Sequence, residues 1–401
     1  MSVEHLQEVK LGALVRSKRT ITYGIVQPGN NTPNGHLLIR SKDYSRGWCS
    51  TEKMMRVSDE IEKPYSRSRV AEGDLLITVV GANIGKIAVV PPWLDSANIS
   101  RSVARISIDP EKSDPRYVRQ FLEGGVSRLI WINSLGGAQP VLNLESLRKF
   151  SIPAIPLPEQ KKIAEILSTW DDALEKLDDL IATKERQKHG LMQQLLTGKK
   201  RLPGFGKSWV EKRLGDLFSN RKEAKRSDLP LLSITMALGV VDRDELVKKD
   251  SSNADKSKYL RITLGDIGYN TMRMWQGVSA LSTLEGIVSP AYTICTPGDG
   301  ILGEYAAHLF KLPKTISLFH RYSQGLVSDT LNLKYPNFAQ IEVTLPDDIK
   351  EQQAIASILD TSDQEIALLK KKRDAIDDQK RGLMQQLLTG KVRVKLEDSA
   401  A

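Results

Sequence analysis

The segment Gly81-Ala-Asn-Ile-Gly-Lys86 could bind phosphate, because two glycines precede a lysine there. Phosphate-binding loops place backbone N–H groups around the phosphate and follow the lysine with Ser or Thr, whose hydroxyl binds Mg²⁺. Here the glycines are separated by one residue too few, and Ile87 occupies the position that needs the hydroxyl. We therefore interpret the segment as a turn at the end of a strand, not as a nucleotide site.

Two other short segments are similar to catalytic motifs but lack essential parts. Pro91-Pro-Trp93 is similar to the Asp-Pro-Pro-Trp of adenine methyltransferases, but Val90 replaces the residue that accepts a hydrogen bond, and no glycine-rich cofactor loop precedes it. Asp347 and Asp348 lie too close together for the separated carboxylates of a metal nuclease, and Asp348 is better placed as the N-cap of a following helix. The sequence therefore predicts no enzyme active site.

Metal and disulfide frameworks are not expected. The five histidines are scattered without metal-ligand spacing, and Cys49 and Cys295 lie in different halves of the chain. This cysteine usage fits a reducing cytoplasm. No run of about 18 apolar residues exists, and the N-terminus lacks the pattern of a signal peptide. We expect a cytoplasmic protein with no membrane partner, no metal and no cofactor of its own.

Side chains that could bind nucleic acid gather in polar regions of both halves. Arg, Lys, Asn and Gln are the usual residues that hydrogen-bond base edges, and other basic residues bind phosphates. In the first half such residues surround Tyr44 and Trp48, and in the second half they follow Gly268. For each residue, the alternative is ordinary solvated surface or scaffold. The predicted DNA contacts are Arg40, Lys42, Arg46, Thr78, Asn83, Lys86, Arg101, Tyr269, Asn270, Arg273 and Gln276.

The net charge of +9 is unevenly distributed along the chain. Residues 1–158 carry 21 basic and 15 acidic side chains, and residues 200–350 carry 21 and 17, so their net charges are +6 and +4. Residues 159–199 and 351–391 are close to neutral. Basic domains favour a polyanionic partner, and neutral segments favour a structural role.

The elements that must position these residues are organised by a repeat. The ten residues from Gly190 to Lys199 return unchanged from Gly382 to Lys391, 192 positions later. The match extends back without gaps to Glu159 in the first copy, and 21 of the 41 aligned residues are identical. This period is far longer than the roughly 20–50 residues of solenoid repeats. The sequence therefore predicts a duplicated protein in which each half ends in the same element.

Each copy of this element is predicted to be a long helix. Apolar residues alternate at spacings of four and three, for example Ile163, Leu167, Trp170 and Leu174, which is the pattern of a heptad seam. Because both copies share this register, we expect the helices to pair antiparallel within one chain. Four glutamines lie away from the seam at identical places in both copies, and we predict that they bind partner proteins: Gln193, Gln194, Gln385 and Gln386.

The predicted fold class is α+β. Short β-branched runs such as 74–80 and 103–108 predict strands, and a helix is expected from Pro115 to about Ser134. Glycines and apolar residues of the first half recur in the second; Gly73, for example, returns as Gly265. The predicted organisation is a mixed α/β domain at 1–158, a helix at 159–199, a second mixed domain at 200–350, a second helix at 351–391 and a tail at 392–401.

These features resemble the specificity subunit of type I DNA restriction-modification systems, and the resemblance covers essentially the whole chain. The segments that carry it are 156–167, 351–359, both copies of Leu-Met-Gln-Gln-Leu-Leu-Thr-Gly-Lys, and, within the mixed domains, 73–78 and 265–277. The two halves differ at 347–350, where four additional residues precede the second helix.

The resemblance implies two target-recognition domains separated by two long antiparallel coiled-coil helices, with each domain reading one half of a split double-stranded DNA sequence. It also implies that the subunit is non-catalytic. Two methyltransferase subunits would dock on it, and restriction/translocase subunits would join the complex. S-adenosylmethionine, ATP and Mg²⁺ would belong to those partners.

Two alternatives belong to other functional classes. An architectural coiled-coil protein would bind DNA without sequence preference. A free-standing methyltransferase or nuclease would need the cofactor loop and acidic cluster that the motifs above lack.

Overall fold

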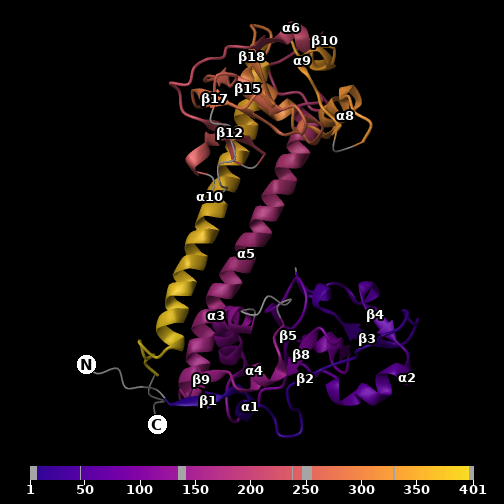
Figure 1. Ribbon diagram of the computed structural model, residues 1–401, viewed down its shortest axis with the longest axis vertical. Coiled ribbons are helices and arrows are strands. Elements are labelled where there is room, and N and C mark those ends of the chain that lie inside the picture. The colour runs from indigo at the N-terminus through magenta and orange to yellow at the C-terminus, as the bar shows by residue number, and fades with distance from the viewer. Residues whose placement is uncertain are drawn as a thin grey trace. The chain divides into compact units, whose positions relative to one another are not determined.

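The chain forms two compact units (Figure 1). Unit 1 comprises Met1–Asp178 and Lys372–Ala401, and unit 2 comprises Asp179–Lys371. The division falls inside two long helices, α5 (Leu157–Leu195) and α10 (Ile349–Leu388), so each helix contributes one part to each unit. The computed structural model describes residues 7–45, 47–133, 141–236, 238–245, 255–327 and 330–396.

Unit 1 is built on a four-stranded antiparallel sheet in the order β2-β8-β5-β6, beside a three-stranded sheet β4-β3-β7 and a pair β1-β9. The strands and helices of this unit before α5 are β1 (Glu8–Lys10), α1 (Leu11–Leu14), β2 (Thr22–Tyr23), β3 (His36–Ile39), β4 (Met55–Val57), α2 (Asp59–Glu62), β5 (Leu75–Thr78), β6 (Ile87–Val89), β7 (Asn98–Ile99), β8 (Val103–Ile106), α3 (Pro115–Asn133), α4 (Leu144–Arg148) and β9 (Ser151–Pro153). The predicted strands and the predicted helix from Pro115 are thereby confirmed.

Unit 2 repeats the same plan with the four-stranded sheet β11-β18-β15-β16 and the pair β10-β19. It adds the pairs β12-β13 and β14-β17. Between α5 and α10 its elements are β10 (Trp209–Arg213), α6 (Leu214–Leu217), β11 (Phe218–Arg221), β12 (Leu232–Thr235), β13 (Gly239–Asp242), β14 (Leu260–Ile262), β15 (Ile267–Asn270), β16 (Ser279–Leu281), β17 (Gly286–Val288), β18 (Tyr292–Pro297), α7 (Gly303–Leu309), α8 (Pro313–Tyr322), α9 (Tyr335–Phe338) and β19 (Glu342–Pro346). The matching sheets confirm the predicted duplication.

In each unit, both long helices contribute buried residues to one hydrophobic core. In unit 1, Ile163 of α5 and Leu387 of α10 are buried in one cluster with the residues of the main sheet. In unit 2, Leu195 of α5 and Ile355 of α10 occupy the equivalent cluster. An N-terminal residue of one helix therefore meets a C-terminal residue of the other in each unit, which confirms the predicted antiparallel pairing.

Ion pairs set the register of the helices within each unit. In unit 1, Lys380 pairs with Asp171 at 2.6 Å, and in unit 2, Lys188 pairs with Asp363 at 2.5 Å. Each member of the second pair lies 192 positions from a member of the first. Lys380, which is 7% exposed, therefore lies within the contact between the two helices as an ion-pair partner.

The repeated Thr-Gly that follows each helix ends it. Gly198 and Gly390 both have φ of +69°, a left-handed conformation that glycine adopts without steric cost. The N–H of Lys200 donates to the Gln194 carbonyl at 3.1 Å, and the N–H of Val392 donates to the Gln386 carbonyl at 3.2 Å. These bonds satisfy carbonyls that the end of a helix leaves free. The first helix therefore ends at Leu195, four residues before the predicted boundary.

Candidate nucleic-acid interface

A buried aspartate fixes the start of the central strand in each unit. In unit 1, Asp74 accepts hydrogen bonds from Arg19 Nη2 at 2.6 Å and Ser107 Oγ at 2.6 Å. In unit 2, Asp266 accepts from Arg221 Nε at 2.8 Å and Thr296 Oγ1 at 2.7 Å. Buried carboxylates are stable only when they are paired and hydrogen-bonded. A buried, hydrogen-bonded aspartate therefore precedes both β5 and β15. It fixes the start of each strand, and each strand leads into the turn that follows.

In unit 1, the turn after β5 gathers the predicted contact residues. The hydroxyls of Tyr44 and Thr78 share a hydrogen bond of 2.8 Å, which fixes the segment around Lys42 beside the end of β5. The N–H of Val79 donates to the Ser102 carbonyl at 2.8 Å, which places Arg101 at the same end. Burial raises the pKa of Tyr44 well above its ordinary value, so its hydroxyl stays neutral. Segments that are far apart in the sequence therefore meet at the end of strand β5.

The turn between β5 and β6 carries the remaining predicted contacts of unit 1. Gly81 and Gly85 have φ of +102° and +83°, which side chains rarely adopt. The N–H of Gly85 donates to the Thr78 carbonyl at 2.8 Å and closes the turn, so its interpretation as a turn is confirmed. Asn83 is partly exposed and Lys86 is exposed. Within the described residues, Lys42, Lys86 and Arg101 form no ion pair, so their charges are free for a ligand.

In unit 2, the corresponding turn joins β15 to β16. Arg273 and Gln276 are exposed there, and neither side chain has a hydrogen-bond partner among the described residues. The Asn270 carboxamide oxygen accepts the N–H of Met272 at 3.0 Å, so this predicted contact residue shapes the turn. Gly277, with φ of +79°, ends it. A guanidinium and a carboxamide therefore occupy the turn where unit 1 presents Asn83 and Lys86.

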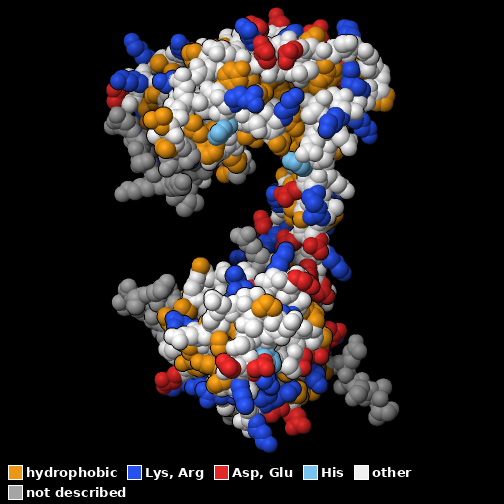
Figure 2. All heavy atoms as spheres, turned by 90° about the vertical axis from the view of Figure 1, so that its right-hand side faces the viewer, with side chains coloured by type: hydrophobic (Ala, Val, Ile, Leu, Met, Phe, Trp, Pro, Cys, Tyr) orange, Lys and Arg blue, Asp and Glu red, His pale blue; other side chains and the backbone are white. Residues whose placement is uncertain are grey.

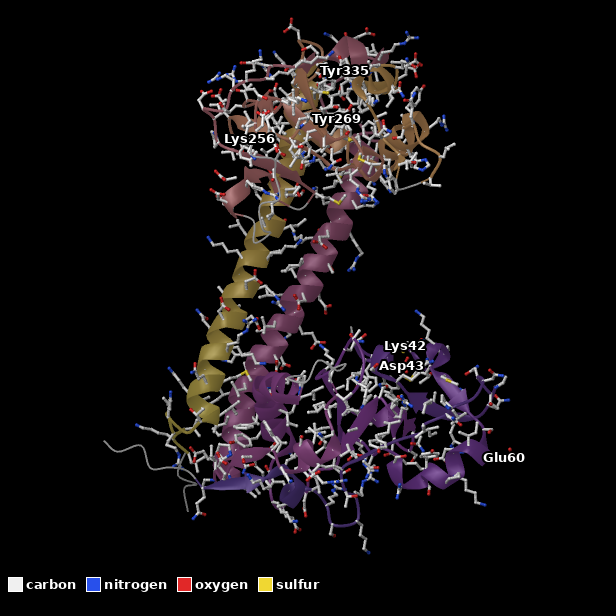
Figure 3. The ribbon with its side chains drawn as sticks, in the orientation of Figure 1. Lys42, Asp43, Glu60, Lys256, Tyr269 and Tyr335 are labelled. Atoms are coloured by element: carbon white, nitrogen blue, oxygen red, sulfur yellow. The ribbon has the colours of Figure 1, made fainter. Side chains whose placement is uncertain are left out.

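Two predicted contacts are corrected because their side chains are wholly buried. Thr78 and Tyr269 are each 0% exposed. Thr78 bonds the Tyr44 hydroxyl, and the Tyr269 ring lies inside unit 2 (Figure 3), 5.3 Å from the Phe338 ring. Residue type suggested a polar role, but Thr78 and Tyr269 belong to inner strands of their sheets, whose residues are buried on both faces. They support the turns and do not reach a ligand at the surface.

Two more predicted contacts have other outcomes. Arg40 is held by Asp43, whose carboxylate accepts the Arg40 backbone N–H at 2.8 Å and both Nε and Nη2 at 3.3 Å. Its guanidinium would have to leave this partner to bind a phosphate, whereas Lys42, at the margin of unit 1 in Figure 3, has no ion pair within the part of the chain that the structure describes. Arg46 lies outside the described residues.

Lys311, which sequence reasoning missed, braces the turn of unit 2. Its ammonium donates to the carbonyls of Gly277 and Ser279, both at 2.6 Å. Ser279 begins β16, the edge strand of its sheet, and carbonyls on an edge lack ladder partners. Burial, with a smaller contribution from the positive charge of Lys188, lowers the pKa of Lys311 to about 8. Only the three-dimensional arrangement reveals this role, because Lys311 lies far from the turn in sequence.

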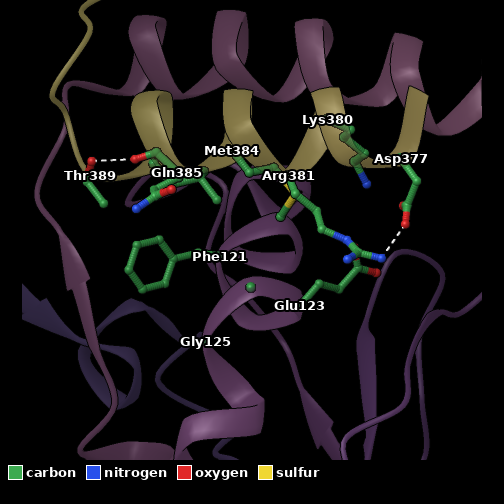
Figure 4. Close-up of a pocket in the computed structure, with 11 residues that line it drawn as sticks. Phe121, Glu123, Gly125, Asp377, Lys380, Arg381, Met384, Gln385 and Thr389 are labelled. Atoms are coloured by element: carbon green, nitrogen blue, oxygen red, sulfur yellow. Dashed lines mark hydrogen bonds and ion pairs between the residues drawn. The ribbon is translucent and has the colours of Figure 1, made fainter. Parts of the chain in front are cut away.

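The predicted partner-binding residues are exposed. Gln193 and Gln194 on α5, and Gln385 and Gln386 on α10, face outward beside buried leucines. Gln385 also lines a hollow of about 570 Å³ in unit 1, between α3 and the end of α10. Phe121 and Met384 give its wall an apolar part, and Thr389 donates to the Gln385 carbonyl at its end (Figure 4). This side of α10 therefore borders an open hollow that a partner could enter.

Neither metal chemistry nor a membrane segment is suggested by the part of the chain that the structure describes. It contains no group of three or more His, Cys, Asp or Glu side chains that could hold a metal ion. None of its helices is long and apolar enough to cross a membrane.

Comparison with known families decides the classification. The family described as "Type I restriction modification DNA specificity domain" matches residues 20–183 and 295–378, which is more than half of the chain. The chain belongs to this family. Both matched segments contain parts of the sheets and of the long helices described above.

Curated relatives carry names from the same family. The chain is 24% identical over 416 residues to the "Putative type I restriction enzyme MjaX specificity subunit" of Methanocaldococcus jannaschii, a match covering 94% of this chain and 91% of the relative. It is 34% identical over 178 residues to the "Type I restriction enzyme EcoBI specificity subunit" of Escherichia coli. That match covers only 43% of this chain and 37% of the relative. The chain therefore matches one relative over nearly its full length at lower identity, and it matches another over less than half of its length at higher identity.

Solved structures show the same fold. The S subunit of a type I restriction-modification system from M. genitalium aligns with a TM-score of 0.58 at 15% identity, covering 99% of both chains. A chain from a structure of type I R-M system assembly aligns with a TM-score of 0.57 at 16% identity, covering 97% of this chain and 98% of the other. At such identities the likeness concerns the fold alone.

Proposed function

We propose that this specificity subunit reads a bipartite double-stranded DNA target, with one unit contacting each half-site, and that it is itself non-catalytic. The observation that carries the proposal is the pair of equivalent turns after β5 and β15. Each turn follows a strand that begins after a buried aspartate held by an arginine and a hydroxyl group, and each exposes hydrogen-bonding side chains that differ between the units.

This arrangement fits sequence recognition because the residues that hold the turns in place are different from the exposed residues that would contact bases. Asp74 and Asp266 repeat, whereas the exposed residues Lys86 and Gln276 do not. Amide and cationic side chains discriminate base edges in the major groove, and unpaired cations bind phosphates. Two different surfaces on one scaffold are what two different half-sites require.

The same duplication supports two partner sites. The outward glutamines are identical in the two helices, so whatever binds near Gln194 can bind in the same way near Gln386. We infer that two methyltransferase subunits dock on each chain and that restriction/translocase subunits join through the complex. S-adenosylmethionine, ATP and Mg²⁺ would then be bound by those partners.

Exchange of one recognition unit tests the proposal. Replacing residues 207–345 with the matching stretch of a relative should change one half of the methylated sequence and leave the other half unchanged. Mapping of methylated adenines in the host genome gives the result for the wild type and the chimera. Changes in both halves would contradict one unit per half-site. Equal affinity of the wild type for target and random duplexes would instead indicate an architectural DNA-binding protein.

A further inference from the structure

Helix α8 presents a polar strip next to the turn of unit 2. Lys314, Ser317, His320 and Arg321 are exposed, whereas Phe319 is buried in the core. At 3.6 residues per turn the exposed residues share one side of the helix. We call these four residues the α8 face.

The α8 face is fixed against the recognition turn by three contacts. The rings of Trp275 and His320 meet edge to face, with centroids 5.9 Å apart. The Ile316 side chain fills the space beside Gly277, where an added Cβ would lie 2.9 Å from it. Lys311, just before α8, bonds two carbonyls at the end of the turn. The turn and the helix therefore form one continuous surface.

The α8 face carries basic side chains and lies in a stretch of sequence without acidic residues. From Tyr305 to Ser328 the sequence contains no aspartate or glutamate. Within the described residues, neither Lys314 nor Arg321 forms an ion pair or a side-chain hydrogen bond. Figure 2 looks at the side of the molecule where Figure 1 places α8. Lys and Arg side chains lie across the middle of unit 2 there, and a group of Asp and Glu side chains lies above them.

The cations at the start of helix α3 in unit 1 are paired. Helix α3 begins after a segment held by Gln160, as α7 begins after a residue held by Gln352, so the start of α3 corresponds to the start of α7. On α3, Arg116 pairs with Asp114 at 2.9 Å, and Arg119 pairs with Glu123 at 2.9 Å. Among the described residues, Lys314 and Arg321 of α8 therefore differ from Arg116 and Arg119 of α3, which are compensated by neighbouring carboxylates.

We propose that the α8 face binds the phosphate backbone of the DNA whose bases the adjoining turn contacts, with Lys314 and Arg321 as the phosphate ligands. This inference rests on the proposed function and adds a site that the sequence did not suggest. Basic side chains next to base-reading residues fix the register of the protein on the duplex. The unpaired state of both cations leaves them available without breaking an internal ion pair.

The salt dependence of binding tests this directly. Each phosphate contact contributes about 0.9 to the slope of log affinity against log salt for duplex DNA. The double variant Lys314→Ala/Arg321→Ala should therefore lower the magnitude of that slope by about 1.8. At about 0.15 M salt the same relation predicts roughly thirtyfold weaker binding. The loss should be similar for target and random duplexes, because phosphates carry no sequence. Binding is measured by titrating labelled duplexes with the complex purified from the host.

A matched control removes two exposed lysines elsewhere in unit 2 that form no ion pair among the described residues. Lys222 follows β11, which lies at the opposite edge of the sheet from β16, and Lys207 precedes β10. The variant Lys207→Ala/Lys222→Ala should keep the wild-type slope. Equal slope losses in both variants, or an unchanged slope in the α8 variant, would overturn the proposal. If the wild type shows no preference for its target, the proposed function fails instead, whatever the slopes are.

Discussion

The buried carboxylate of Asp266 should be the most sensitive position in unit 2. Asp266 is 1% exposed and accepts four hydrogen bonds. They come from Arg221 Nε at 2.8 Å and Nη2 at 3.2 Å, Thr296 Oγ1 at 2.7 Å and the Thr263 N–H at 2.9 Å. The substitution Asp266→Ala removes every acceptor and leaves the donors without partners. Because β15 starts at the next residue, the strand that leads into the recognition turn loses its anchor.

The expected cost follows from the partners left behind. Breaking a buried ion pair by removing one member costs about 3–5 kcal/mol, because the other charge stays desolvated. Arg221 is 24% exposed and lies 3.7 Å from Glu223, which can take up part of its charge. The low end of the range, about 3 kcal/mol, is therefore expected. For a unit of this size that corresponds to a Tm lowered by roughly 6–12 °C.

Hydrogen exchange read by mass spectrometry can assign the loss to one unit. Peptides covering β15 and β18 should lose protection in Asp266→Ala, while peptides covering β5 and β8 should keep it. Asp74→Ala should give the reverse pattern, and Asp228→Ala, at an exposed ion pair, should change neither. Equal loss in both units would show that the aspartates do not act locally. Unchanged protection of β15 would refute the anchoring role altogether.

Three further predictions follow from other contacts. Because burial lowers the pKa of Lys311 from 10.5 to about 8, the folded chain releases a proton between these pH values that the unfolded chain retains. The free energy of unfolding should therefore rise from pH 8 to 10.5, and Lys311→Met should abolish that part of the rise in denaturant titrations. Lys380→Met should destabilise unit 1 by about 3 kcal/mol, and adding Asp171→Leu should restore most of the loss; a double mutant without recovery would contradict the pairing. Replacing Gln385 and Gln386 with alanine should reduce the complex from two methylating subunits to one in native mass spectra, and an unchanged mass would argue against this partner surface.

The turns after β5 and β15 could be predicted from the sequence only in part. The turns were predictable because glycines and strand-forming runs act locally, and Gly85 and Gly277 stand at the same place in both copies. The roles of individual polar residues were not predictable. Thr78 faces the interior because Tyr44, far away in the sequence, supplies its partner. The α8 face was overlooked because its residues gain significance only beside Trp275.

The sequence by itself determined the duplication, the two long helices and their shared register. These features depend on periodicity and on backbone preferences of neighbouring residues, which a single chain displays directly. Only the tertiary structure decided which charged side chains are free and which are paired with another residue of the protein. Arg40 is held by Asp43 and Lys380 by Asp171, whereas Lys314 and Arg321 have no such partner among the residues that the structure describes. Burial and ion pairing depend on residues brought together from distant parts of the chain, so residue type alone cannot separate a ligand contact from an internal brace.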